Sequence, residues 1–448
     1  MTIRKKEFYA QLYKLAIPIA VQSLVMSLLY LTDQLMVGQL GDAAIATVGM
    51  ASKVYGVIGV VLSGLATGVS VFAAQYWGMR DREGVSKFLG LGLIVGTVLS
   101  LGFALLVFGF PEAILGAFTT DARVLDEGRS FIRIAAISYV PTMLTLLYSA
   151  IMRSTGHTKY PMVASIVVVG INVVLNYLLI FGHAGFPELG LEGSAIATLI
   201  SKTIECALII GAVYRYRLPG AVSPVRLFRV PRDIVSKFAR TTYPIVLAEL
   251  VWVLSEFAYS VIYSRMGTTE MTAMTLSFPL QGLSIGLLTG LSGAAAIMVG
   301  NKLGAGDKEE AYDIAVRCIR FGLWFSLAFG AVMAALSPFY VSLFNVSPEA
   351  NRLGTYVIWV FAGFMWVKVS NMIIAGGILQ SGGDGKFVFA MESIVTWAVG
   401  VPLGLLLSFV WKQPVFWVYF FLSLEEAVRL AFGLLRIRSR KWMKQLTA

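Results

Sequence analysis

Asp33 is the residue whose chemistry is least expected from its surroundings. It lies in the apolar run from Leu15 to Val37, which is long enough to cross a bilayer and too long for the core of a cleaved signal peptide. An isolated carboxylate in such a segment is costly, so an acid found there marks an ion or substrate pathway. Asp33 is therefore the first candidate functional residue.

Three polar residues on two later apolar runs can accompany Asp33. Asn172 and Asn176 are four positions apart, which places both on one helical face, and Thr198 lies in the following run. At a rise of about 1.5 Å per residue, all four positions fall in the outward half of the membrane. A carboxylate among amide and hydroxyl oxygens can bind a proton or a small hard cation. The alternative is that the amides and the hydroxyl only hydrogen-bond neighbouring helices.

A second set of buried charges lies in the other half of the chain. Glu249, Trp252 and Glu256 share one helical face by their spacing. We expect that face to line a cavity and to bind substrate or act as a second charge site. Lys368 and Glu392 lie on two further runs at similar depth and are candidates for an ion pair, which can be functional or can simply join helices.

Composition indicates the structure that must position these residues. The chain has 448 residues, of which 57% are hydrophobic and 14% are charged. A water-soluble fold of this composition would expose too much apolar surface, and about twelve apolar runs have the length of a membrane span. We predict an all-α polytopic membrane protein with about twelve transmembrane helices and no sizeable soluble domain.

The formal net charge of +11 is distributed unevenly. Basic residues gather before the first run, between the sixth and seventh runs, and after the last, whereas the alternate loops hold acids. This asymmetry follows the positive-inside rule and places both termini in the cytoplasm. The basic surplus therefore faces anionic lipid, and a nucleic-acid partner is not expected. We predict a multi-pass protein of a plasma (inner) membrane.

The chain is two copies of one half. A shift of 226 residues superposes Pro18 on Pro244, Gly64 on Gly290 and Asp81 on Asp307. Residues with backbone roles seldom agree at one offset by chance, and six helices per copy give parallel repeats, as in transporters. We predict an N-terminal lobe at 1–218, a cytoplasmic linker at 219–235 and a C-terminal lobe at 236–448.

Asp33, Asn172 and Asn176 have no identical counterparts in the second half of the repeat. Asp33 falls opposite Tyr259, and the pair of asparagines falls opposite Val399 and Leu403 at a shift of 227. On this pattern, the first half holds a polar cluster that the second half lacks.

Motifs for enzymes, cofactors and structural metals are missing from the sequence. Cys206 and Cys318 lie in different halves, and His157 and His183 lie in separate loops, so neither a disulfide nor a metal centre is indicated. Sodium at Asp33 is the one metal we consider. The glycine-rich stretch ending in Lys386 lacks the spacing of a phosphate-binding loop. We expect no enzyme and no cofactor, so transport would be driven by a gradient of H⁺ or Na⁺.

Several motifs resemble those of the multidrug and toxic compound extrusion (MATE) transporters over nearly the whole chain. They are Pro18 with Asp33, GQLG at 38–41, RSTGHTKYP at 153–161, NVVLNYLLIFG at 172–182, GSAIAT at 193–198, VGNKLGAGD at 299–307, GGDGKF at 382–387 and VGVPL at 399–403. The resemblance implies two six-helix lobes that form a V around a central cavity. It also implies export of amphipathic, often cationic, organic compounds in exchange for protons or sodium.

The resemblance also assigns site residues. Asp33, Asn172, Asn176 and Thr198 match the family's amino-terminal cation site, and Glu249 matches an acid of many bacterial members. Some members have an aspartate where Asn176 stands, and the sequence departs at Trp252 and Val369 from a branch with a second sodium site. We therefore prefer proton over sodium coupling, because a single carboxylate with amide partners is neutralised by one proton.

Other functions remain as alternatives. A related flippase for lipid-linked oligosaccharides would line its cavity with cations for pyrophosphate, whereas the charges expected here are mainly acidic. A membrane-embedded transferase would need paired acids for magnesium diphosphate, and a channel would not explain the two-lobe repeat with one asymmetric acid. We expect a monomer in the lipid bilayer whose other partner is a small organic substrate.

Overall fold

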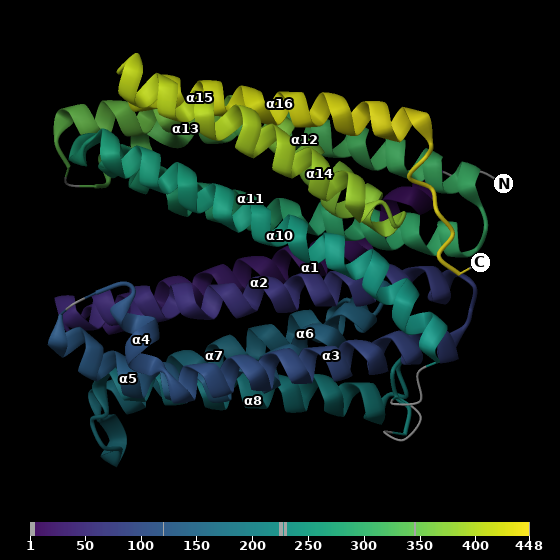
Figure 1. The fold of residues 1–448 in the computed structure, drawn as a ribbon, viewed down its shortest axis with the longest axis horizontal. Coiled ribbons are helices and arrows are strands. Elements are labelled where there is room, and N and C mark those ends of the chain that lie inside the picture. The colour runs from purple at the N-terminus through teal and green to yellow at the C-terminus, as the bar shows by residue number, and fades with distance from the viewer. Residues whose placement is uncertain (1–4, 120, 224–226, 228–230, 345, 448) are drawn as a thin grey trace. The chain divides into compact units, whose positions relative to one another are not determined.

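The computed structural model describes residues 5–119, 121–223, 227, 231–344 and 346–447. Residues 224–226 and 228–230 of the predicted linker lie outside this part of the chain. The described residues form helices joined by short loops, without strands (Figure 1). Eleven of these helical segments are long and apolar enough to cross a membrane. A further helix, α16 (Val415–Ser439), is apolar except for charges near its middle and in its last turn. The predicted all-α polytopic fold is confirmed.

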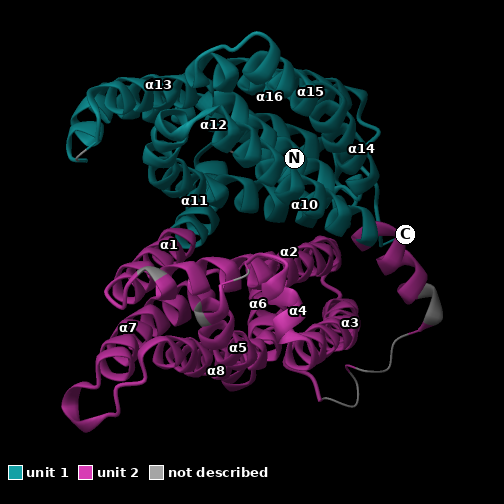
Figure 2. Ribbon diagram, turned by 60° about the vertical axis from the view of Figure 1, so that its left-hand side comes forward, with its two compact units in different colours: residues 1–20, 243–448 teal, residues 21–242 magenta. Residues whose placement is uncertain are grey.

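The helices group into two compact units, coloured separately in Figure 2. Unit 2 covers Val21–Thr242 and unit 1 covers Met1–Ala20 with Tyr243–Ala448. The helices of the first half are α1 (Lys5–Gly38), α2 (Asp42–Gly78), α3 (Arg82–Gly109), α4 (Pro111–Gly116), α5 (Ala122–Ile137), α6 (Tyr139–Ser154), α7 (Lys159–Phe181), the short η1 (His183–Gly185) and α8 (Gly190–Arg215). Those of the second half are α10 (Arg232–Met266), α11 (Thr268–Gly304), α12 (Lys308–Ser342), α13 (Pro348–Asn371), η2 (Met372–Leu379), α14 (Gly385–Val395), η3 (Thr396–Gly400), α15 (Val401–Leu405), η4 (Leu406–Val410) and α16.

The first helix of each half begins in the unit formed by the other half. Phe8 and Leu12 of α1 are buried in the apolar core of unit 1. Phe238 of α10 packs on Phe72 in unit 2, with ring centroids 6.0 Å apart. Our boundaries from the sequence kept each of these segments with its own half, at 1–218 and 236–448. Contacts across a repeat are invisible to an internal alignment, which is why the exchange was not anticipated.

The repeat itself is visible in the helix starts. Asp81 caps α3 by accepting a hydrogen bond from the Gly84 amide at 2.9 Å, and Asp307 caps α12 through the Glu310 amide at 3.0 Å. These caps satisfy amides that lack a partner within the helix. The hydrogen bond from Glu310 also lowers the pKa of Asp307. Asp81 and Asp307, which the repeat alignment superposes, therefore cap the third membrane-spanning helix of their halves in the same way.

The C-terminal segment folds back onto the loop before α14. Asp384 in that loop accepts hydrogen bonds from Arg436 Nε and Lys444 Nζ, both at 2.7 Å. Burial raises the pKa of Asp384, but the hydrogen bonds from Arg436 and Lys444 outweigh burial, and the pKa lies below its ordinary value. Trp442 is fully buried beside this cluster, and Lys444 donates its backbone amide to Gly382. The tail is thereby fixed to unit 1.

Unit 1 departs from regular α-helix where unit 2 does not. Its fifth span contains the π-helical turns η3 and η4, and its fourth ends in the π-helical η2. The corresponding span of unit 2, α7, is one continuous α-helix. Such widened turns redirect side chains and often occur at functional or specially packed sites. They matter here because Thr396 of η3 and Asn371 at the start of η2 both join buried polar contacts.

Candidate functional site

Asp33 and the two asparagines meet in unit 2 as the sequence predicted. Asn176 Nδ2 donates to Asp33 Oδ1 at 2.6 Å and also to Asn172 Oδ1 at 2.9 Å. Asn172 and Asn176 are fully buried on α7, whereas Asp33 on α1 is half-buried. The amide of Asn176 therefore joins the carboxylate to the interior of the unit.

The fourth predicted member of the cluster is not joined to it. Thr198 lies half-buried on α8 and forms no hydrogen bond within the part of the chain that the structure describes. Asn176 Oδ1, in contrast, is buried and has no hydrogen-bond partner among the described residues. A buried acceptor without a partner is unfavourable, and a bound cation or a proton donor would satisfy it. The cluster thus contains a free acceptor next to the Asp33 carboxylate.

A second polar layer joins the same two helices closer to their beginnings. Gln22 Nε2 of α1 donates to Ser165 Oγ of α7 at 3.1 Å. Gln22 and Ser165 are separated by 143 positions, the same separation as Asp33 and Asn176. Equal offsets mean that α1 and α7 run parallel in register, and the two contacts lie about three helical turns apart. The sequence analysis did not find this layer, although the eleven-residue spacing on both helices was a usable signal.

The second layer contains a buried ion pair. Ser165 Oγ donates to Glu205 Oε1 at 3.0 Å, and Lys202 Nζ pairs with Glu205 Oε2 at 3.0 Å. The Glu205 side chain is 2% exposed and that of Lys202 is 14% exposed. Arg153 Nη1 extends the chain of contacts by donating to Gln22 Oε1 at 3.4 Å. Because Ser165 and Lys202 both donate to Glu205, the arrangement suits an ionised carboxylate.

Close packing of α7 and α8 holds the two layers together. These helices lie side by side in unit 2 (Figure 1). A side chain at Gly193 would place its Cβ 2.7 Å from the Leu179 carbonyl carbon, so only glycine permits this approach. Small residues at such contacts are a general device of membrane helix packing. The approach brings the α8 face that carries Thr198, Lys202 and Glu205 toward α7.

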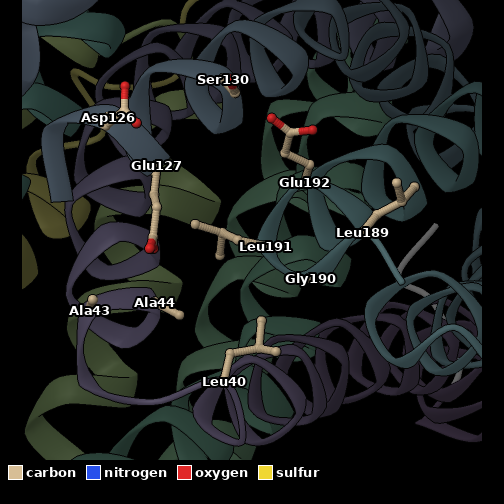
Figure 3. A pocket seen from close by; sticks show the side chains of 10 residues that line it. All are labelled: Leu40, Ala43, Ala44, Asp126, Glu127, Ser130, Leu189, Gly190, Leu191 and Glu192. Atoms are coloured by element: carbon tan, nitrogen blue, oxygen red, sulfur yellow. The ribbon is translucent and has the colours of Figure 1, made fainter. Parts of the chain in front are cut away.

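An acidic pocket lies in unit 2 between the turn that follows α1, the start of α2, α5 and the start of α8. It has a volume of about 410 Å³ and is shown in Figure 3. Its lining includes Leu40, Ala43, Ala44, Asp126, Glu127, Ser130, Leu189, Gly190, Leu191 and Glu192. The carboxylates of Glu127 and Glu192 point in from α5 and α8. The pocket adds negative charge at the end of the unit where α1 finishes and α8 begins.

In unit 1, the face of α10 predicted to carry a charge site is accessible. Trp252 is 47% exposed, Glu256 is exposed and Glu249 is half-buried. Neither acid forms an ion pair within the described residues. These two carboxylates are therefore available, and the described residues of unit 1 give them no structural partner.

The predicted pairing of Lys368 with Glu392 is wrong. Lys368 Nζ binds Glu426 Oε1 of α16, and Asn371 Nδ2 donates to the Glu426 backbone oxygen at 2.8 Å. Glu392 is half-buried and has no hydrogen bond or ion pair within the described residues. The expected similar depth of Lys368 and Glu392 does not say which neighbour either side chain faces. The glutamates of α16 were nearer.

The second half also has a polar cluster at the position of the first, which corrects our prediction that it lacks one. Tyr259, the repeat equivalent of Asp33, donates to Glu425 Oε2 at 2.5 Å. Thr396 Oγ1 donates to Glu425 Oε1 at 2.9 Å, and Arg429 Nη2 pairs with the same oxygen at 3.0 Å. Glu425 is buried and receives all three donors. The alignment overlooked the cluster because its acid comes from α16 and not from the first helix.

A profile of the MatE family matches residues 18–178 and 244–406, one segment in each half. The chain belongs to the MatE family. This assignment confirms the resemblance seen in the motifs, and the two matched segments reproduce the internal repeat. Members of the MATE family are membrane transporters, so the protein is a multi-pass membrane transporter and not a member of an enzyme family.

Curated relatives have low sequence identity but match nearly the whole chain. An uncharacterised transporter, YisQ of Bacillus subtilis (strain 168), is 24% identical over 438 residues, which cover 97% of this chain and 95% of YisQ. A probable multidrug resistance protein NorM of Rhizobium meliloti (strain 1021) is 27% identical, with 94% of this chain and 92% of NorM covered. Among solved structures, an outward-facing multidrug resistance MATE family transporter of the MOP superfamily superposes with a TM-score of 0.86 at 20% identity, covering 98% and 99% of the two chains. That similarity supports the MATE fold.

Proposed function

We propose that this MATE protein is a proton-coupled antiporter that exports amphipathic, cationic organic compounds by alternating access. The observation that carries the proposal is the state of Asp33. It is a half-buried acid within a membrane span, held by one amide of Asn176 and without an ion pair among the described residues. A carboxyl group in that position can bind and release a cation while the helices around it stay folded.

The coupling step uses the charge of Asp33. Proton binding from the outward side removes that charge, lets α1 repack against α7 and favours release of the exported compound. Asn176 holds the carboxylate in place through Nδ2, and its Oδ1, which has no partner among the described residues, is an acceptor available to a proton donor. Asn172 completes the hydrogen-bonded cluster by accepting from Asn176, and Thr198 on α8 lies outside it. We favour the proton over sodium because the cluster has a single carboxylate with amide partners, which one proton neutralises.

The exported compound is inferred from charge and from relatives. Several relatives are named probable multidrug resistance proteins. In unit 1, Glu249, Glu256 and Glu392 have no pairing cation within the described residues, while Lys368 and Arg429 are both paired with glutamates. The available charge is therefore negative and attracts organic cations. A flippase for pyrophosphate-linked lipids would need free cations instead, which makes it the weaker alternative.

The cellular setting follows from the same proposal. We place the protein in the plasma (inner) membrane with both termini in the cytoplasm, because basic residues gather on that side of the predicted spans. It acts as a monomer whose partners are lipid, a small organic substrate and the coupling ion.

The test is ethidium transport in proteoliposomes driven by an imposed pH step or an imposed sodium step. We expect the pH step to drive transport, and Asp33→Asn to abolish the driven component. Glu188→Gln is the matched control, because Glu188 is an exposed acid in the loop before α8 of the same unit. Full proton-driven transport by Asp33→Asn would overturn the assignment of Asp33. Transport driven by sodium alone would replace the proton as coupling ion.

A further inference from the structure

Lys202 is a largely buried cation, 14% exposed, placed between two acids of unit 2. On α8 it lies one helical turn beyond Thr198 and three residues before Glu205, so all three share a face. It pairs with Glu205 in the structure and also interacts electrostatically with Asp33 on α1 and with Tyr55 on α2. The ammonium of a lysine sits on a flexible four-carbon stem and can change partners without movement of the backbone.

In unit 1, the residue that corresponds to Lys202 is Arg429, and it pairs with the acid of its cluster. Arg429 lies near the middle of α16, as Lys202 lies near the middle of α8, and each is on the last membrane-spanning helix of its half. Arg429 binds Glu425, the acid that Tyr259 contacts at the repeat position of Asp33. In unit 1, a tethered cation therefore occupies the acid of the cluster permanently. In unit 2, the corresponding cation is held away from the cluster by Glu205.

We propose that Lys202 is the built-in counter-ion of the Asp33 site: it pairs with Glu205 while Asp33 carries the coupling cation and moves to Asp33 when that cation leaves. This inference rests on the proposed function, because it requires Asp33 to bind and release a cation. Lys202 is a positioning residue for that exchange and does not contact the exported compound.

The contacts around Glu205 make the exchange reversible. Ser165 continues to donate to Glu205 Oε1 when Lys202 leaves, and Gln22 holds Ser165 from α1. Glu205 therefore keeps a hydrogen bond during the interval in which it lacks its ion pair. Gln22 and Asp33 both lie on α1. When Lys202 leaves Glu205 in the layer of Gln22 and pairs with Asp33 in the other layer, both changes therefore affect α1. The pair of layers thus links cation loss to the position of that helix.

Opposite effects of two substitutions distinguish this role from a purely structural one. In proteoliposomes loaded with ethidium, the readout is the coupling-cation concentration that gives half-maximal driven transport. Lys202→Met removes the competitor for Asp33, so we expect that concentration to fall about tenfold. Glu205→Gln frees Lys202 to remain at Asp33, so we expect the concentration to rise by a similar factor. A structural ion pair would lower the amount of folded protein in both variants and leave the concentration unchanged.

The double variant Lys202→Met/Glu205→Gln supplies the decisive comparison. It leaves no unpaired buried charge, so it tests the proposal even if a single variant does not fold. We expect it to match the fall seen with Lys202→Met, because Glu205 acts through Lys202. An unchanged concentration in the double variant, or shifts of the same sign in both single variants, would overturn the inference.

Asp33→Asn, measured beside these variants, separates the two proposals. If Asp33→Asn abolishes driven transport while the Lys202 variants behave as the wild-type protein, the counter-ion role alone fails. If Asp33→Asn retains driven transport, the coupling function fails and the counter-ion role fails with it.

Discussion

The Tyr259 hydroxyl donates a hydrogen bond to Glu425 Oε2 at 2.5 Å. Tyr259 occupies the repeat position that Asp33 occupies in the other half. The two repeats therefore use one location for different purposes. In unit 2, the acid comes from the first helix and has no ion pair with any described residue. In unit 1, the first helix supplies a neutral phenol, and the acid on α16 is paired with Arg429. This difference is why we assign coupling to unit 2.

Substitution of Tyr259 tests the structural role of the unit 1 cluster. Tyr259→Phe removes one hydrogen bond to a buried carboxylate, which typically contributes about 1.5 to 3 kcal/mol. Glu425 keeps its contacts with Thr396 and Arg429. We expect a lower Tm in detergent with unchanged dependence of transport on the coupling cation. Loss of cation coupling in this variant would show that unit 1 also takes part in the exchange.

Recognition of a cationic substrate by α10 is tested by neutralising its two acids. Glu249→Gln/Glu256→Gln removes the charges that have no partner in unit 1, so we expect ethidium binding to weaken about tenfold or more. The effect should diminish for an uncharged substrate. Glu349→Gln, an exposed acid at the start of α13, is the control and should bind ethidium normally. Equal affinity in the double variant and the wild type would remove these acids from the substrate site.

The ion pair of Lys368 with Glu426 is expected to stabilise the folded protein. Removal of one member leaves the other buried without a partner, which costs about 3 to 5 kcal/mol for buried pairs in general. We expect Lys368→Met to lower Tm strongly, and Lys368→Met/Glu426→Gln to recover most of the loss. The corresponding pair Lys368→Met/Glu392→Gln should show no recovery, because Lys368 does not contact Glu392. Recovery with Glu392 instead of Glu426 would contradict the observed pairing.

The contacts of Asp384 with Arg436 and Lys444 form a C-terminal clasp. This clasp predicts that the stability of the protein depends on pH. The pKa of Asp384 is lower in the folded protein than its ordinary value of 3.8, so its contribution to stability is complete above that value and is lost as pH falls through the folded pKa. Thermal unfolding from about pH 6 to pH 3 should therefore show wild-type protein and Asp384→Asn converging in Tm at the acidic end. Arg436→Leu should cost more than Lys444→Leu, since Lys444 is the more exposed partner. A constant Tm difference across this range would show that the clasp does not depend on the charge of Asp384.

The sequence by itself determined the class of the protein and the residue at the centre of its site. Hydrophobic runs of spanning length leave helices as the available fold, because backbone groups in lipid must be paired within their own segment. Matching glycines and prolines established the repeat, and the unmatched Asp33 stood out against it. The i, i+4 spacing of Asn172 and Asn176 was enough to predict their shared face, which the contact between their side chains confirms.

The tertiary structure decided which polar groups meet. Helical rise gives the depth of a residue in the membrane, but the direction in which its side chain points relative to another helix depends on packing. Lys368 could therefore be placed at the depth of Glu392 and still bind Glu426. For the same reason, the sequence does not show that the Lys202 and Glu205 pair meets Ser165 and Gln22, because this contact depends on how α1, α7 and α8 pack. Close approach at Gly193, widened turns in unit 1 and exchange of the first helix segments are products of three-dimensional packing, and no local pattern in the sequence specifies them.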